Sequence, residues 1–298
     1  MRWLLSPGPE IVVTGANGFV GTALVRHLRT EECRVIAIGR TAVKGLDRTI
    51  EDYGQLTRRS DERLVHLAQS NILDGSAKNA RYLCDAAVQT TEKLAQEYGS
   101  AMVYVSSATV YGDHYTEPVD ETAILAGTGI YNEMKIACEN AVIAADGCVA
   151  RLANTVGFGM SSATLPAEIA AQLNFGRSGD SSPIKVKRLD PARDWIDVQD
   201  AAAGLASLSI EAVGGIYNLG SGRAVTVRRI VGIMAQLAGQ ASRPIATATE
   251  VATSSSHSYL CLDTLKIRAT TGWTTEHNLE VSLKNYLQRE GIIDVCAG

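Results

Sequence analysis

The stretch from Glu10 to Gly21, Glu-Ile-Val-Val-Thr-Gly-Ala-Asn-Gly-Phe-Val-Gly, decides the fold of this chain. An apolar, β-branched run leads into three glycines, and residues 20–29 then have helical periodicity. Gly15 allows a tight turn, Gly18 lets the backbone approach a pyrophosphate, and Gly21 allows the helix to pack closely on the strand. Because the N–H groups at a helix N-terminus attract phosphate, the stretch predicts a dinucleotide-binding turn. Three glycines at a turn also occur in α/β proteins that bind no nucleotide.

Strand-like and helix-like segments alternate along the first 155 residues. Alternation of this kind is typical of βαβ units, whose crossovers are nearly always right-handed. It predicts an α/β fold with a doubly wound parallel sheet of the Rossmann type. Strands are expected at 10–14, 33–39, 63–68, 101–106 and 148–154, and helices at 20–29, 80–98 and 130–145.

The pattern loosens after residue 156. Helices are expected at 165–175, 194–210, 225–238 and 279–289, with one more strand at 215–219. We expect a smaller C-terminal lobe that is interleaved with the main sheet. In this division, residues 1–156 form the dinucleotide-binding domain and residues 193–221 return to it, whereas residues 157–192 and 222–298 form a substrate-binding lobe.

Composition argues against several other classes of protein. The formal net charge is −4 with acidic and basic residues interspersed, so no nucleic-acid surface is expected. The six cysteines form no Cys-x-x-Cys pair and have no histidines at metal-ligand spacing, which predicts reduced thiols and no metal site. No apolar run is long enough to predict a membrane span, and the apolar run at the start is too short for a secretory signal. These features predict a cytoplasmic protein.

A serine, a tyrosine and a lysine downstream of the glycines have a spacing that permits a hydride-transfer site. Tyr131 and Lys135 are four residues apart on an expected helix, so they share one face. A lysine cation beside a tyrosine favours the phenolate and lowers the pKa of the phenol from its ordinary value near 10. The same cation can hold the nicotinamide ribose. Ser107 ends an expected strand, where its hydroxyl can hold the substrate oxygen while Tyr131 transfers the proton.

The end of the second strand bears on which nicotinamide cofactor binds. An acidic residue here usually bonds the ribose 2′-hydroxyl of NAD, but this chain has Arg40. A guanidinium matches phosphate oxygens two at a time, so Arg40, with Lys44 nearby, favours the 2′-phosphate of NADP. A solvated surface arginine is the alternative. Asp52 and Tyr53 are candidates to border the adenine, and a solvated acidic loop is the alternative for them.

With these residues the chain resembles the extended short-chain dehydrogenase/reductase family, in the branch that acts on nucleotide sugars. The resemblance covers almost the whole chain and implies an NAD(P)-binding Rossmann domain with a small substrate lobe. It rests on Thr14–Gly21, His66–Ala68, Ser107–Gly112, Tyr131–Lys135, Arg151–Asn154, Arg193–Ile196, Tyr217–Gly222, Leu262–Asp263 and Gly272–Trp273. The cofactor contacts that it implies are Gly15, Asn17, Gly18, Phe19, Val20, Gly21, Arg40, Asp52, Tyr53, Leu67, Ala68, Tyr131 and Lys135.

The resemblance also implies substrate contacts. Ser107 and Thr109 would lie at the reacting sugar, and Asn154 and Arg193 would face a diphosphate. An amide and a guanidinium are independently suited to donate hydrogen bonds to phosphate oxygens. For Arg193 the alternative is a salt bridge to an acidic residue of its own segment, Asp194 or Asp197.

The chain departs from the family pattern at three places. Family dehydratases usually carry an Asp-Glu pair after the active-site Ser or Thr, and Ala108 and Thr109 stand there instead, which argues against dehydration. Ala87 stands where the helix before the serine strand often has asparagine. An arginine that often contacts the nucleotide diphosphate is missing from 253–260, where the chain offers Ser254, Ser255, Ser256 and His257.

These observations predict an NAD(P)-dependent oxidoreductase that acts on a nucleotide-linked sugar. A reductase of a keto-sugar nucleotide, of the 4-ketoreductase type and with Tyr131 as proton donor, is preferred. A C4 epimerase that keeps its NAD bound is one alternative, and a non-catalytic NADP-binding sensor or scaffold is another. The family often dimerises through two helices, here 80–98 and 130–145, so a homodimer is expected; burial of both helices within the monomer is the alternative.

Overall fold

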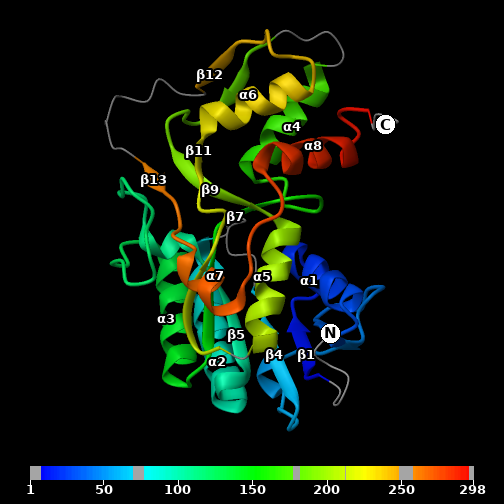
Figure 1. The fold of residues 1–298 in the computed structure, drawn as a ribbon, viewed down its shortest axis with the longest axis vertical. Coiled ribbons are helices and arrows are strands. Elements are labelled where there is room, and N and C mark those ends of the chain that lie inside the picture. Colours follow the sequence, from blue (N-terminus) through cyan, green and yellow to red (C-terminus); the bar gives the residue numbers. More distant parts are fainter. Residues whose placement is uncertain (1–7, 70–76, 177–181, 212, 248–257, 295–298) are drawn as a thin grey trace.

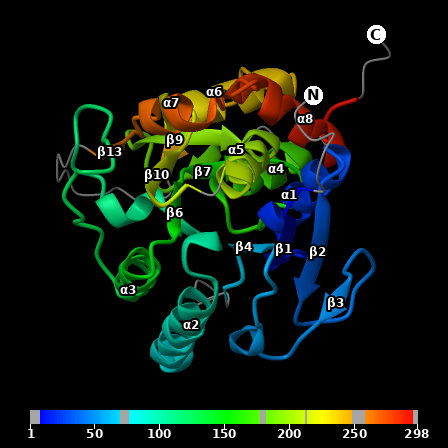
Figure 2. The ribbon, with the colours of Figure 1, turned by 60° about the horizontal axis from the view of Figure 1, so that its bottom comes forward.

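A seven-stranded parallel sheet forms the centre of the larger part of the molecule (Figures 1 and 2). The computed structural model describes residues 8–69, 77–176, 182–211, 213–247 and 258–294. The strand order, β3-β2-β1-β4-β5-β6-β10, confirms the predicted Rossmann-type sheet. Its strands are β1 (Glu10–Thr14), β2 (Arg34–Gly39), β3 (Arg48–Thr49), β4 (Glu62–His66), β5 (Met102–Ser107), β6 (Cys148–Leu152) and β10 (Gly215–Leu219).

Helices cover both faces of this sheet (Figure 2). Ile11 and Val13 of β1 belong to the core beneath α1 and α5, whereas Val12 belongs to the core beneath α2 and α3. Because successive side chains of a strand point to opposite faces, burial on both faces requires an unbroken apolar run. The four helices are α1 (Phe19–Thr30), α2 (Ala77–Tyr98), α3 (Ile130–Ala144) and α5 (Val198–Glu211).

A second group of elements lies beyond the carboxyl edge of the sheet, at the top of Figure 1. Strand β9 (Ala192–Asp197) pairs with β7, β11 and β13, and β8 pairs with β12. Ile169, Leu173 and Met234 belong to the separate apolar core of this group. The remaining elements are β7 (Asn154–Val156), α4 (Leu165–Gly176), β8 (Ile184–Val186), β11 (Ala224–Thr226), α6 (Val227–Leu237), β12 (Ile245–Thr247), β13 (Tyr259–Leu260), α7 (Leu265–Thr271), α8 (Leu279–Arg289) and the 3₁₀ turns η1 (Tyr53–Gln55), η2 (Gly99–Ala101) and η3 (Ala108–Tyr111).

Residues 194–197 are strand, so the helix expected over 194–210 was wrong at its start. The helix begins only at Val198. Asp194 stays extended because its carboxylate accepts hydrogen bonds from the backbone N–H groups of Ser221 (2.8 Å) and Gly222 (3.0 Å). These bonds tie β9 to the turn that follows β10.

The strand expected over 148–154 also divides. Its first part is β6, which ends at Leu152 within the main sheet. Asn154 begins β7, which pairs with β9 instead. The backbone therefore crosses from the main sheet to the second group at Ala153, whose N–H donates to the carbonyl oxygen of Leu219 (2.9 Å). In the part of the chain that the structure describes, no helix has the length and apolar character needed to cross a membrane.

Candidate active site

The glycine turn joins β1 to α1 at the carboxyl edge of the main sheet. Gly15 has a φ of +68°, and a Cβ there would lie 2.9 Å from the backbone nitrogen of Ala68. A Cβ on Gly21 would lie 2.1 Å from the Gly15 carbonyl oxygen, whereas at Gly18 the nearest atom would be 3.2 Å away. Among the described residues, no side chain caps the N-terminus of α1. The turn therefore offers open backbone and unpaired N–H groups, which fit a pyrophosphate.

The end of β2 lies beside this turn. A Cβ on Gly39 would meet the amide oxygen of Asn17 at 3.2 Å, so Asn17 lies against the end of the strand. Arg40 follows at once and is exposed. Its side chain has no hydrogen bond or ion pair with any residue in the described part of the chain. This guanidinium is available to an anionic ligand that extends from the turn across β2.

Tyr53 and Asp52 approach the glycine turn from η1. Tyr53 is buried, which raises the pKa of its phenol, and a hydrogen bond from the backbone of Gly15 opposes that rise. Asp52 accepts a hydrogen bond from the N–H of Gly54 (2.9 Å), which caps η1. Tyr53 thus contacts the turn itself, and Asp52 shapes the loop beside it.

Two adjacent serines end β5 and have different surroundings. Ser106 is buried and donates a hydrogen bond to Oε1 of Glu139 (2.5 Å). Ser107 is half-buried and accepts a hydrogen bond from the N–H of Thr109 (3.2 Å), which caps η3. Because successive side chains of a strand alternate, only Ser107 lines the pocket.

Tyr131 and Lys135 lie one turn apart on α3, beside the end of β5. The Nζ of Lys135 donates to the carbonyl oxygen of Val105 (2.8 Å) and lies 5.8 Å from the centre of the Tyr131 ring. Burial lowers the pKa of Lys135 to about 8. Burial also raises the pKa of Tyr131, and a hydrogen bond with Ser107 opposes that rise. The structure brings the three predicted catalytic residues together, and we call Ser107, Tyr131 and Lys135 the catalytic corner.

Aromatic rings support this corner from the sheet. Tyr104 on β5 lies with its ring centre 4.8 Å from Nζ of Lys135 and stacks on His66 of β4. Nδ1 of His66 is 2.7 Å from Oγ1 of Thr14. Burial, together with the nearby Lys135, lowers the pKa of His66 to about 3. His66 is therefore neutral near pH 7, and the positive charge of the corner belongs to Lys135.

A pocket of about 380 Å³ opens over Ser107. Thr109 lies 3.0 Å from the Ser107 hydroxyl and donates a hydrogen bond to Oδ1 of Asn132 (2.7 Å). Neither residue 108 nor residue 109 is a carboxylic acid. The pocket is lined by Ser107, Ala108, Thr109, Gly112, Asp113, His114, Ala126, Gly127, Thr128, Asn132, Leu152, Ala153, Asn154, Arg193 and Leu260.

The two residues implied for a diphosphate line this pocket but are engaged within the protein. Asn154 donates to the carbonyl oxygen of Asp194 (3.2 Å). Nη2 of Arg193 donates to Oδ2 of Asp113 (2.8 Å) and to Oγ of Ser258 (2.7 Å). Its ion-pair partner is thus Asp113, not an acidic residue of its own strand. We call Arg193, Asp113 and Ser258 the arginine end of the pocket.

A buried polar network behind the pocket was missed by the sequence analysis. Arg151 and Glu139, whose side chains are each 3% exposed, form an ion pair of 2.7 Å. Arg151 also donates to the hydroxyl of Tyr111 (2.9 Å), which donates to Oδ1 of Asn218 (2.7 Å). The available signal was an arginine within the apolar run of β6, because a charge on a buried strand requires a partner.

The remaining residues singled out from the sequence lie on α1, after β4 and on α2. Phe19 and Val20 begin α1, and Leu67 and Ala68 directly follow β4. Ala87 is half-buried on α2. Ser254, Ser255, Ser256 and His257 lie outside the described residues. Within the described ranges, no group of three histidine, cysteine or acidic side chains could hold a metal ion.

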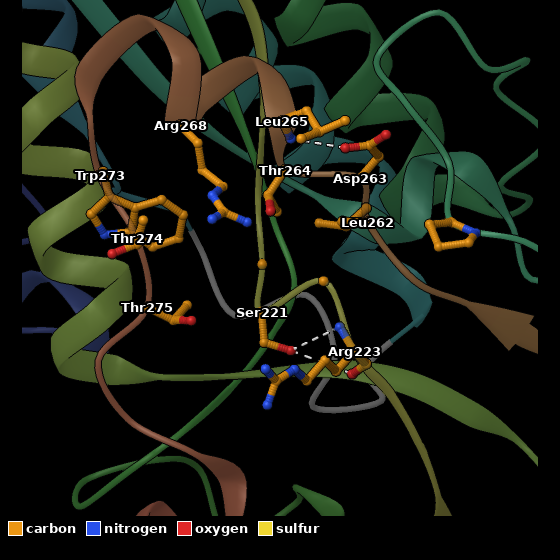
Figure 3. Close-up of a pocket in the computed structure, with 13 residues that line it drawn as sticks. Ser221, Arg223, Leu262, Asp263, Thr264, Leu265, Arg268, Trp273, Thr274 and Thr275 are labelled. Carbon is orange, nitrogen blue, oxygen red and sulfur yellow. Dashed lines mark hydrogen bonds between the residues drawn. The ribbon is translucent and has the colours of Figure 1, made fainter.

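Figure 3 shows a separate pocket of about 610 Å³, between the turn after β10 and α7. Ser221, Asp263 and Trp273 line it, and it contains none of the predicted site residues. Arg268 and Arg223 also line it, but their guanidinium groups lie far apart in the view (Figure 3). Ser107, Tyr131 and Lys135 do not line this pocket.

Comparisons with known proteins agree with this geometry. The chain is 24% identical over 300 residues to the dTDP-6-deoxy-L-talose 4-dehydrogenase (NAD(P)(+)) of Kitasatospora kifunensis, covering 92% of this chain and 93% of the relative. It is 26% identical over 299 residues to the GDP-6-deoxy-D-mannose reductase of Pseudomonas aeruginosa, covering 93% and 96%.

Solved structures share the fold. The structure of RMD from Pseudomonas aeruginosa complexed with NADPH has a TM-score of 0.78 and 22% identity, covering 94% of this chain and 98% of that one. The UDP-glucose 4-epimerase of Thermotoga maritima with UDP-glucose has a TM-score of 0.79 and 18% identity, covering 95% and 100%. The model of the NAD-dependent epimerase/dehydratase family matches residues 11–220. This chain, with its glycine turn and catalytic corner, belongs to the NAD-dependent epimerase/dehydratase family.

Proposed function

We propose that this protein is an NADP(H)-dependent reductase of a keto-sugar nucleotide. The observation that carries the proposal is the catalytic corner at the end of β5, without a carboxylic acid at positions 108 and 109. Tyr131 supplies a proton, but the site has no acid–base pair at the positions that dehydration of a sugar uses in this family. Two relatives, a dTDP-sugar dehydrogenase and a GDP-sugar reductase, support the same class of substrate.

The residues of the corner have separate tasks in a reduction. Bound NADPH supplies a hydride to the carbonyl carbon of the sugar. Tyr131 donates its phenolic proton to the oxygen that becomes the alcohol. Ser107 contacts that oxygen and Tyr131, and so holds the reacting group beside its proton donor. The Lys135 ammonium beside the ring favours the phenolate that remains.

The choice of cofactor rests on the glycine turn and Arg40. Open backbone at Gly18 accepts the pyrophosphate, with Asn17, Phe19, Val20, Leu67 and Ala68 around it. Arg40 is exposed and has no hydrogen bond or ion pair among the described residues, so it can pair with a 2′-phosphate. NADP is therefore preferred over NAD.

An epimerase that acts at C4 is the second candidate. One tyrosine can both remove and return a proton, so the same corner suits a cycle of oxidation and re-reduction. The fold shared with the UDP-glucose 4-epimerase of Thermotoga maritima is compatible with this reading. Such an enzyme would show no net consumption of NADPH. A sensor or scaffold has no need of the proton-transfer set.

The sugar nucleotide would span the pocket from Ser107 to Arg193. Its sugar would lie at Ser107 and Thr109, and its diphosphate would approach Asn154 and Arg193. Residues 157–192 and 222–298 would form the lobe that holds the nucleotide. Arg193 would then exchange the Asp113 carboxylate for a phosphate.

We also propose a homodimer through α2 and α3. Tyr82 on α2 is 74% exposed and Ile143 on α3 is 36% exposed, so both helices present apolar side chains to solvent. A charge at either position, as in Y82E or I143E, should disrupt a dimer. Sedimentation of the wild type as a monomer at micromolar concentration would contradict the proposal.

The direct test follows the absorbance of NADPH with keto-sugar nucleotides. The panel contains dTDP- and GDP-linked 4-keto-6-deoxy sugars, with NADH in parallel. Stoichiometric consumption of NADPH with formation of the deoxy-sugar alcohol is expected. Interconversion of sugar epimers without consumption would establish the epimerase, and thermal stabilisation by NADP without either reaction would support the sensor.

A further inference from the structure

Two side chains on one face of α3 attach that helix to the central sheet. Lys135 and Glu139 are four residues apart, so they lie one turn apart on the same face of the helix. Nζ of Lys135 donates to the carbonyl oxygen of Val105 (2.8 Å), and Oε1 of Glu139 accepts from the hydroxyl of Ser106 (2.5 Å). The helix is therefore attached to two consecutive residues of β5, directly before Ser107.

The carboxylate of Glu139 also joins α3 to β6. Ser106 and Arg151 are paired residues of the neighbouring strands β5 and β6, so their side chains lie on the same face of the sheet. Nη2 of Arg151 donates to Oε2 of Glu139 (2.7 Å), and its Nε lies 3.2 Å from both carboxylate oxygens. Nη1 of the same guanidinium donates to the hydroxyl of Tyr111 (2.9 Å). One carboxylate thus holds the helix on two strands at once.

Stability alone does not explain an ion pair at this place. The side chains of Glu139 and Arg151 are each 3% exposed, so the pair gives up most of its hydration. Replacing a buried ion pair by apolar residues of similar volume is often neutral or stabilising, because the desolvation cost is removed. Apolar side chains provide no direction, whereas a guanidinium fork matches a carboxylate only over a narrow range of positions. The pair therefore fixes where α3 lies on the sheet more closely than apolar packing would.

We infer that the buried pair of Glu139 and Arg151 sets the position of α3 on the sheet and thereby places the two catalytic side chains of that helix. Tyr131 and Lys135 lie on the preceding turns of α3, so a shift of the helix along its axis moves both of them. A shift by the rise of one residue is about 1.5 Å, and a misplacement of about 1 Å can lower a rate about 10²-fold. Glu139 and Arg151 are positioning residues, since neither lines the pocket over Ser107.

The position of Lys135 affects one end of the cofactor and not the other. Its Nζ lies 5.8 Å from the centre of the Tyr131 ring. In the proposed function this ammonium favours the phenolate of Tyr131, and it can also hold the nicotinamide ribose. The glycine turn, by contrast, belongs to β1 and α1, which the pair of Glu139 and Arg151 does not join. The inference thus rests on the proposed function and adds to it the residues that hold its parts in place.

The test compares two ligands that share the adenosine end of the cofactor. Adenosine 2′,5′-bisphosphate has no nicotinamide ribose, so in the proposed binding mode it needs the glycine turn and Arg40 but not the catalytic corner. The main variant combines Glu139→Leu with Arg151→Met and so replaces the pair by apolar side chains of similar size. Val142→Ala is the matched control, because Val142 is fully buried on α3 and has no part in the pair. Calorimetry gives the dissociation constants of NADPH and of the bisphosphate, and circular dichroism gives the melting temperature.

The double variant should melt near the wild-type temperature but bind NADPH about tenfold more weakly, while its affinity for the bisphosphate stays within about twofold. Val142→Ala should show the reverse: a lower melting temperature, because it leaves a cavity, with both affinities kept. An unchanged affinity for NADPH in the folded double variant would overturn the inference. An equal loss for both ligands would overturn it too, since that result indicates general damage to the domain.

Arg151→Lys decides the case if the double variant does not fold. Lysine keeps a positive charge beside Glu139 but has no fork, so this variant should fold and bind NADPH about threefold more weakly, with no loss for the bisphosphate. Wild-type affinity for NADPH in Arg151→Lys would then overturn the inference.

Neither ligand is a sugar nucleotide, so the result is separate from that of the proposed function. If only NADPH binding weakens but no keto-sugar nucleotide is reduced, the inference holds and the proposed substrate class fails. If the wild type reduces such a substrate and the variants bind NADPH normally, the inference alone fails. A wild type that prefers NADH is tested in the same way with NADH and adenosine diphosphate. With a substrate in hand, the double variant should lower kcat about 10²-fold and change the KM of the sugar nucleotide much less.

Discussion

The two ends of the pocket over Ser107 hold their polar side chains in opposite ways. At the catalytic corner, Lys135 on α3 donates to a backbone carbonyl of β5, and Tyr131 on the same helix lies beside Ser107. At the arginine end, Nη2 of Arg193 donates hydrogen bonds to Asp113 and Ser258. The polar groups of the corner therefore keep partners on the sheet, whereas an anion that bound at Arg193 would have to displace Asp113.

This difference follows from where the groups are anchored. Lys135 is 5% exposed and contacts a backbone carbonyl of the central strand β5. The Arg193–Asp113 pair is partly exposed and joins a loop to β9, the central strand of the small sheet. The buried Lys135 keeps its position because its partner is a backbone carbonyl. The half-exposed ion pair of Arg193 and Asp113 contributes only a modest free energy to stability, so a ligand can break it more easily.

The largest effect is expected at the catalytic corner. Tyr131→Phe removes one hydroxyl from a half-buried ring, so fold and cofactor binding should persist while turnover falls about 10²- to 10⁴-fold. The measurement is single-turnover NADPH oxidation with the substrate found in the panel. Ser107→Ala should cost less, because Thr109 lies close by. Near-wild-type turnover of Tyr131→Phe would show that the proton comes from another group.

The next effect concerns the cofactor. Arg40→Asp places a carboxylate where a 2′-phosphate would bind, so NADP affinity should fall about 10- to 100-fold while NAD affinity is spared. Dissociation constants for both cofactors, in wild type and variant, provide the measurement. Arg29→Asp is a surface control, since Arg29 already pairs with Asp47. A wild type that prefers NAD would contradict the assignment and favour the epimerase.

Cofactor affinity should decrease at alkaline pH because Lys135 loses its proton. Burial lowers its pKa to about 8, so the ammonium is lost as pH rises through that value. Cofactor affinity should weaken by up to about tenfold per pH unit above it. Folding should not weaken for this reason, because a lysine with a lowered pKa in the folded state adds stability as pH rises toward 10.5. Titration calorimetry across this range, with Lys135→Met as the flat control, measures the effect.

The smallest effect is expected at the arginine end. Asp113→Asn weakens the competitor for Arg193, so a nucleoside diphosphate should bind about two- to fivefold more tightly. Uridine, thymidine and guanosine diphosphates are suitable probes, and salt should reduce the difference. Weaker binding in Asp113→Asn would mean that Asp113 orients Arg193 for the ligand instead of withholding it.

Local sequence was sufficient to predict where the glycine turn, Tyr131 and Lys135 lie in the fold. The glycine turn and the Tyr-x-x-x-Lys pair depend on residues that are close in the chain, so periodicity and spacing predicted both. The doubly wound parallel sheet followed from the alternation of elements. By contrast, the ion pair of Arg193 with Asp113 joins residues eighty positions apart, and no spacing rule could predict it.

Two further features depended on tertiary contacts. Asp194 lies in the extended strand β9 and not in a helix, because backbone N–H groups of a distant turn donate hydrogen bonds to the Asp194 carboxylate. The bond that Thr109 of η3 donates to Oδ1 of Asn132 on α3 is the second, because it joins residues 23 positions apart on different elements.

The paired serines at the end of β5 have a consequence for mutational scanning. Ser106 belongs to the buried network of Glu139, so its loss should lower the amount of folded protein in a cell. Ser107 contacts Tyr131 and lines the pocket, so its loss should leave abundance intact and lower flux per molecule. A scan that scores only growth would rank the two positions together. Scoring abundance and growth in parallel would separate an architectural residue from a chemical one at neighbouring codons.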